Sequence, residues 1–236
     1  FQDAALIDLK LRWFDPTQAY CANRIDKGLS EALMLRRASC TIYLAQESDT
    51  LGKDSELAST LAQGKPVVAY IPEVSDDYFN EHLKGVSNAN TGKSEPEYLL
   101  QQLKIYQPDA AWSDSVIRDW CDDPTKVNTN ELRDRLKKSM KNHYDKRADT
   151  LCRAHPLGIQ VNLQTGVANG VLVVRSVPDC AQVIRRILMR ELEFTLLDTA
   201  DFIELRESIS DCIFRVVTAD AMLTNTFWNF YIEPTE

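Results

Sequence analysis

Residues 38–72 constrain the fold of this chain more than any other stretch of its sequence. An uncharged apolar run, residues 40–45, is followed by a polar loop and then by Asp54-Ser55-Glu56-Leu57-Ala58, which is typical of the start of a helix. Gly64-Lys65-Pro66 then leads into a second apolar run at residues 67–71. A strand, a helix and a second strand in this order predict a unit of a parallel α/β sheet.

Glu56 is singled out by its position in this unit. It lies at the start of the predicted helix, just beyond the carboxyl end of the strand at residues 40–45. In open α/β sheets this edge is where ligands bind, so Glu56 is a candidate for catalysis. The alternative is structural, because acidic side chains in the first turn of a helix are stabilised by the helix dipole.

The alternation of strands and helices extends toward the N-terminus. Residues 9–14 (LKLRWF) are predicted to form a strand that ends at Asp15-Pro16, since proline cannot continue a ladder. Residues 25–38 are predicted to form a helix. Its apolar side chains at helical spacing are Ile25, Leu29 and Leu33. The first third therefore predicts a parallel, flavodoxin-like α/β core.

The rest of the chain divides into two further regions. After the core at residues 1–75, residues 76–153 are charged and helical in pattern, which predicts a mainly helical insertion or linker. Residues 154–236 return to strands and are predicted to form an α+β module that extends the same sheet or makes its own layer. Its predicted elements are a β-hairpin at 158–163 and 171–174, a helix at 181–194 and a strand at 212–217.

Composition narrows the class of protein. The chain has 236 residues, a formal net charge of -8 and a pI near 5.0, which argues against a nucleic-acid partner. No apolar run approaches the ~18 residues of a membrane span, so no membrane association is expected. The six cysteines show no CxxC spacing and the three histidines lie far apart, so no metal site is predicted. Free thiols in a reducing, cytoplasmic compartment are expected.

Several consecutive segments together resemble a known family. Leu33-Met34-Leu35-Arg36-Arg37-Ala38-Ser39 leads into CTIYLA (40–45), then QESDTLGKD (46–54), Ser55-Glu56-Leu57-Ala58 and Gly64-Lys65-Pro66-Val67. This order is similar to that of the Toll/interleukin-1 receptor (TIR) domain and its relatives, the nucleoside 2-deoxyribosyltransferase-like proteins. Both families have a strand, a polar loop, a helix with a key glutamate and a following strand. The resemblance implies a TIR-like core.

The resemblance also implies N-glycosidic chemistry, with Glu56 as the matching carboxylate. Enzymatic TIR domains cleave NAD, and deoxyribosyltransferases cleave nucleosides through a glycosyl-enzyme. Breaking a C1′–N bond develops oxocarbenium character on the ribose, which a carboxylate stabilises. Nicotinamide leaves as a neutral base, so one carboxylate and an aromatic surface suffice. No cofactor is therefore expected, NAD being the substrate.

Five further residues are predicted to bind this substrate. Trp13 and Phe14, at the end of the first predicted strand, are placed to stack on the leaving base, and Asp15 to bind a ribose hydroxyl. Ser48 and Asp49 lie in the loop before the helix that carries the glutamate. The alternatives are core packing for Trp13, a turn for Asp15 and a solvated loop for Ser48 and Asp49.

A second candidate region lies in the aromatic tail TNTFWNFYIEP. Asn225, Trp228 and Asn229 combine polar amides with a stacking surface. In deoxyribosyltransferases a C-terminal segment of a neighbouring subunit completes the site, which the resemblance extends to this tail. The alternative is a segment that seals the hydrophobic core.

Three functions follow from this interpretation. The first is an NAD glycohydrolase that releases nicotinamide and ADP-ribose as the effector of a defence or cell-death pathway. Such an effector is expected to need a homo-oligomer or a partner protein for activation. The second is a catalytically silent TIR-like module that senses a nucleotide signal or scaffolds an assembly. The third is a nucleoside deoxyribosyltransferase.

Overall fold

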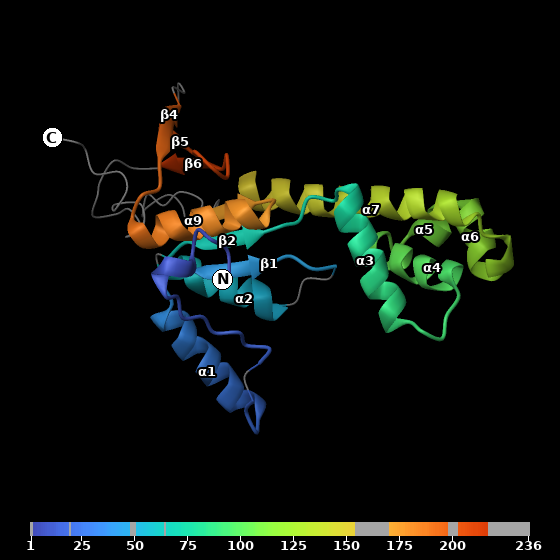
Figure 1. Ribbon diagram of the computed structural model, residues 1–236, viewed down its shortest axis with the longest axis horizontal. Helices are drawn as coiled ribbons and strands as arrows, with labels where there is room; N and C mark the ends of the chain where they lie inside the picture. The colour runs from blue at the N-terminus through green and yellow to red at the C-terminus, as the bar shows by residue number, and fades with distance from the viewer. Residues whose placement is uncertain are drawn as a thin grey trace. The chain divides into compact units, whose positions relative to one another are not determined.

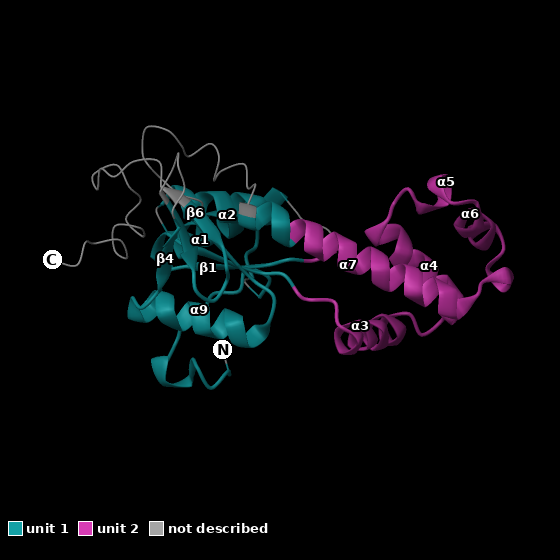
Figure 2. Cartoon of the chain, turned by 90° about the horizontal axis from the view of Figure 1, so that it is seen from above, with its two compact units in different colours: residues 1–45, 49–71, 148–236 teal, residues 46–48, 72–147 magenta. Residues whose placement is uncertain are grey.

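The computed structural model describes residues 2–18, 20–47, 51–63, 65–153, 170–197 and 203–216. The chain forms two compact units, which Figure 2 shows in different colours. Unit 1 consists of residues 1–45, 49–71 and 148–236, and unit 2 of residues 46–48 and 72–147. Within the described part of the chain, no helix has both the length and the apolar character needed to cross a membrane.

Unit 1 contains a three-stranded parallel sheet, which confirms the predicted mixed α/β class. β1 (Thr41–Leu44), β2 (Val67–Tyr70) and β3 (Val171–Val174) lie in the order β1-β2-β3, and both pairs of neighbouring strands are parallel. All of β3 and the first three residues of β2 are buried. Uncharged apolar runs suit strands that are covered on both faces, which is why the sequence identified β1 and β2.

Two helices cover this sheet. α2 (Leu51–Ala62) connects β1 to β2 and contacts both strands, while α9 (Val177–Met189) contacts β2 and β3. The sheet lies between α2 and α9 in both views (Figure 1). α9 begins at the N-cap residue Ser176, whose hydroxyl accepts a hydrogen bond from the backbone N–H of Asp179.

α1 (Arg24–Arg37) precedes β1 where a helix was expected. It begins at Asn23, whose side-chain oxygen accepts a hydrogen bond of 2.8 Å from the backbone N–H of Asp26. None of its residues is buried. The apolar side chains that identified the helix, Ile25, Leu29 and Leu33, are 84%, 60% and 50% exposed. Helical spacing indicated an apolar face but not what lies against it.

Residues 9–14 do not form the predicted strand. Ile7–Leu9 form a 3-10 helix (η1), and no strand follows it among the described residues before α1. Lys10 has a φ of 48°, a left-handed conformation that interrupts an extended chain. Trp13 and Phe14 are exposed, so the apolar residues that suggested a strand lack the burial that stabilises one.

The C-terminal part of unit 1 differs from the predicted hairpin, helix and strand. Residues 171–174 form β3 of the parallel sheet, while the other predicted hairpin arm, 158–163, lies outside the described residues. The predicted helix at 181–194 is observed as α9, which begins and ends earlier. It stops at Met189 because Arg190 takes a left-handed conformation with a φ of 64°.

An antiparallel sheet follows α9. Its strands are β4 (Phe194–Leu197), β5 (Ile203–Glu207) and β6 (Ile213–Val216), in the order β4-β5-β6. β6 confirms the strand predicted at 212–217. The other two strands were not predicted; of β4, only its first residue, Phe194, had been assigned to the end of the preceding helix.

Unit 2 is helical, as the pattern of its sequence predicted. Its elements are α3 (Asp76–Ala89), α4 (Glu95–Tyr106), α5 (Ala110–Ser113), α6 (Ser115–Asp122), the 3-10 helix η2 (Pro124–Lys126) and the larger part of α7 (Thr129–Arg153). Leu132, Leu136 and Met140 repeat every four residues on α7 and are fully buried. They form the apolar face of α7 in the core of this unit.

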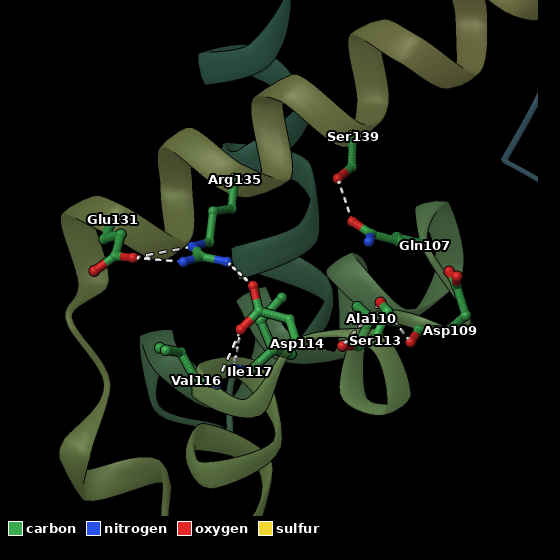
Figure 3. A network of polar contacts seen from close by, with 10 residues as sticks. All are labelled: Gln107, Asp109, Ala110, Ser113, Asp114, Val116, Ile117, Glu131, Arg135 and Ser139. Carbon is green, nitrogen blue, oxygen red and sulfur yellow. Dashed lines mark hydrogen bonds and ion pairs between the residues drawn. The ribbon is translucent and has the colours of Figure 1, made fainter.

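A polar network links α6 to α7 (Figure 3). Asp114 caps α6 by accepting a hydrogen bond of 2.9 Å from the backbone N–H of Val116, and its carboxylate also pairs with Arg135. Arg135 donates two bonds, of 3.0 and 2.8 Å, to Glu131 and lies over the Trp120 ring, 5.5 Å from its centroid. The hydrogen bond from Arg135 lowers the pKa of Asp114.

Candidate active site

α2 is attached to the carboxyl end of β1, and this attachment places Glu56. Nζ of Lys53 donates a hydrogen bond of 3.0 Å to the carbonyl oxygen of Leu44, the last residue of β1. Glu56 follows about one turn later on the same helix and is half-buried. The turn of helix that carries Glu56 therefore lies beside the sheet edge at which α/β folds bind ligands.

Thr60 fixes the orientation of α2 from its buried side. Its hydroxyl donates a hydrogen bond of 2.8 Å to the carbonyl oxygen of Glu56 and lies 2.7 Å from the hydroxyl oxygen of Thr41. Because the single hydroxyl proton of Thr60 is used toward Glu56, Thr41 donates to Thr60. These bonds restrain the rotation of α2 about its axis, and with it the direction in which the Glu56 side chain points.

Four charged side chains interact around this position. Glu56 and Lys53 come from α2, and Lys27 and Glu31, which form an ion pair of 3.8 Å, come from α1. Burial raises the pKa of Glu56, and the neighbouring Glu31 carboxylate raises it further, while Lys53 and Lys27 lower it. When it is ionised, a carboxylate in this position can stabilise a developing cation.

A further positively charged residue, Arg175, lies at the same edge of the sheet. Arg175 directly follows β3, and its Nε donates a hydrogen bond of 2.9 Å to the carbonyl oxygen of Ile71, the residue after β2. Sequence reasoning missed Arg175, although a lone cation between a buried strand and a helix cap was a usable signal. It also missed Lys27 and Glu31, because an i,i+4 pair of opposite charge is typical of a solvated helix face.

Three of the predicted substrate-binding residues are described, and they lie in the irregular segment before α1. Trp13 and Phe14 are 64% and 40% exposed. The carboxylate of Asp15 accepts hydrogen bonds from the hydroxyl and backbone N–H of Thr17, at 2.6 and 2.8 Å, and the hydroxyl bond lowers its pKa. Asp15 therefore makes a local turn, and it is not among the charged groups that shift Glu56.

The other predicted site residues fall on parts of the chain that are not described. Ser48, Asp49, Asn225, Trp228 and Asn229 lie outside the described residues. Their parts in substrate binding stay predictions.

The thiols and metal-binding side chains of the described residues do not supply a second centre. No group of three or more His, Cys, Asp or Glu side chains gathers there as metal ligands do. Among the described residues no two cysteines form a disulfide bond, and the Cys152 thiol donates a hydrogen bond of 3.2 Å to Sγ of Cys212. Burial raises the pKa of Cys40 and of Cys180 to about 11, so both thiols are protonated, and poor nucleophiles, at neutral pH.

Comparison with known proteins adds no relative to this description. The chain matches no family model, no curated protein and no solved structure. The resemblance to the TIR family therefore stays a prediction from the sequence.

Proposed function

We propose that this protein is a nucleotide N-glycosidase that cleaves NAD to nicotinamide and ADP-ribose. The observation that supports this function best is the half-buried Glu56 carboxylate on the helix that follows the first strand of a parallel sheet. Cleavage of an N-glycosidic bond is chemistry to which a single carboxylate can contribute, because it stabilises the charge that develops on the ribose.

The proposed reaction uses Glu56 as its catalytic residue. The C1′–N bond of the nicotinamide riboside half of NAD breaks, and nicotinamide leaves with the electron pair as a neutral base. The ionised carboxylate stabilises the positive charge that develops on the ribose. A water molecule then adds to C1′, and its proton passes to the carboxylate, which releases it to solvent.

The two lysines near Glu56 support a dinucleotide substrate. Lys27 and Lys53 lower the pKa of Glu56, so both ammonium groups act on this carboxylate and favour its reactive, ionised form. The same charges are suited to the diphosphate of NAD, which carries two negative charges beside the scissile nucleoside. Arg175, which follows β3 at the same carboxyl edge of the sheet, supplies a further positive charge there for an anionic substrate.

The proposal is tested by identifying the products that the protein forms from NAD. The full chain is incubated with NAD, and nicotinamide and ADP-ribose are separated and quantified by chromatography. Release of both products in equal amounts supports the glycohydrolase. A deoxyribosyltransferase instead exchanges the base of a deoxynucleoside and leaves NAD intact. If neither reaction is detected but NAD raises the melting temperature of the protein, the protein is a catalytically silent binding module.

In cells, the proposed activity is that of an effector. Hydrolysis of NAD removes a cofactor on which central metabolism depends, so an enzyme of this kind would act in a defence or cell-death pathway. Expression of the wild-type chain is expected to lower cellular NAD, and expression of a Glu56→Gln variant at the same level is not.

A further inference from the structure

The outer face of α1 is apolar. Ile25, Leu29 and Leu33 follow one another at four-residue intervals and are 84%, 60% and 50% exposed. Ala32 and Arg36 are exposed on the same side of the helix. No residue of α1 is buried, so nothing in the described part of the chain covers this stripe.

The opposite face of α1 is the one that lies against its own unit. Its partly buried positions are Lys27, Ser30, Glu31, Met34 and Leu35. Of these, Lys27 and Glu31 act on Glu56 of α2. The inward face thus mixes polar and apolar side chains, while three large apolar side chains, Ile25, Leu29 and Leu33, meet solvent instead of packing inward. The outward stripe is therefore a surface suited to a partner.

We propose that α1 pairs with α1 of a second copy of this chain, antiparallel, across a two-fold axis. An interface of this kind needs a patch that is complementary to itself. With Leu29 of one copy opposite Leu33 of the other, both pairs of leucines meet at the centre. Gly28 and Ala32 keep the centre narrow, and a Cβ added at Gly28 would meet nothing within 4 Å, so there is room for a close approach.

The charges at the two ends of the stripe favour this register. Asp26 and Arg36 are both exposed, and their midpoint along the helix is position 31, which is also the midpoint of Leu29 and Leu33. The register that pairs the leucines therefore also sets Asp26 of each copy opposite Arg36 of the other. A parallel arrangement would instead place like charges together, and would align the helix dipoles unfavourably.

This complementarity identifies a second copy as the occupant of the stripe. One apolar centre and two identical ion pairs come from a single 14-residue helix. A hydrophobic ligand would not require the acid at one end and the base at the other. The dimer is tested by measuring the molecular mass of the protein, which does not depend on whether the protein cleaves NAD.

The experiment measures the mass of the full chain by size-exclusion chromatography with light scattering over a range of concentrations. The expected mass at high concentration is twice the 26.8 kDa of the chain. Leu29→Glu is expected to give only the monomer. The matched control is Leu196→Glu on β4, which changes a leucine that is 66% exposed away from α1 and is expected to leave the dimer intact.

A charge exchange tests the register. Arg36→Glu is expected to weaken the dimer about tenfold, because it sets two acids opposite each other, and adding Asp26→Lys is expected to restore it. The second change keeps the cap bond from the backbone N–H of residue 26 to Asn23, but it removes the bond of 2.6 Å from the Asn23 amide to the Asp26 carboxylate. Circular dichroism checks that each variant is folded.

Three results overturn the proposal. They are a wild-type chain that stays monomeric at every concentration, a dimer that survives Leu29→Glu, and a dimer that Leu196→Glu also dissolves. The proposal is also overturned if the wild-type chain is monomeric and Leu29→Glu lowers its melting temperature, because the stripe is then covered within one chain.

Discussion

The hydroxyl oxygens of Thr41 and Thr60 lie 2.7 Å apart and join the first residue of β1 to the buried side of α2. The Thr60 hydroxyl in turn donates a hydrogen bond to the backbone carbonyl oxygen of Glu56. The position of the candidate catalytic residue is therefore tied to the sheet through two hydroxyl groups.

Replacing Thr60 by valine is expected to destabilise the protein. The valine keeps the shape of the side chain but leaves the Thr41 hydroxyl without its acceptor, at a cost of about 1–3 kcal/mol in the free energy of unfolding. Urea denaturation measures it. Ser59→Ala, at the exposed neighbouring position, is the control and is expected to change stability by less than about 0.5 kcal/mol. Equal effects of the two substitutions would show that the bond contributes nothing.

The raised pKa of Glu56 predicts how Glu56→Gln changes stability with pH. A raised pKa means that the folded state binds this proton more tightly than the unfolded state, whose ordinary value is 4.5. The ionised carboxylate therefore costs stability, and this cost develops as the pH rises from 4.5 through the pKa of the folded protein. Glu56→Gln is expected to raise the melting temperature at pH 7 and to gain less at pH 4. A loss of stability at pH 7 contradicts this.

Two substitutions are expected to move the pKa of Glu56 in opposite directions. Glu31→Gln removes a neighbouring negative charge and lowers the pKa, whereas Lys53→Met removes a positive charge and raises it. The pKa is followed by NMR titration of the side-chain carboxyl carbon of Glu56. If both substitutions moved it the same way, the charges around Glu56 would not be arranged as described.

Unit 2 depends on the buried face of α7. Leu136 is fully buried, and Leu136→Ala is expected to cost about 2–5 kcal/mol in the free energy of unfolding, because it leaves a cavity. Lys138→Ala, at an exposed position on the same helix, is the control. Hydrogen exchange is expected to speed up in residues 76–147 for the leucine variant and to stay unchanged for the lysine variant.

The parts of the fold that the sequence predicted are those with one dominant physical cause. β2 is an uncharged run because it is buried at the centre of the parallel sheet. The helices of unit 2 carry their own caps, such as Ser94 with Glu97. β4 was missed, and its first residue, Phe194, had been assigned to the end of the helix that is observed as α9. The positive φ of Arg190, which ends that helix, has no signature in a sequence without glycine there.

The candidate site was predictable only in part. The catalytic role of Glu56 stays a prediction, but its place on a helix that follows a strand was predicted from the sequence. Lys27 and Glu31 were not, since contact between α1 and α2 depends on which face of α1 turns inward. The spacing of Leu29 and its neighbours identified an apolar side of α1, and the structure shows that this side is exposed while Lys27 and Glu31 are partly buried.

The most direct test of the account is the rate of nicotinamide release from NAD by the wild-type chain and by Glu56→Gln, with Asp54→Asn, an exposed acid of the same helix, as the control. The account predicts that Glu56→Gln lowers the rate by about 10²–10⁴-fold while Asp54→Asn stays near the wild-type rate. Nicotinamide release that is unchanged in Glu56→Gln would contradict the central claim.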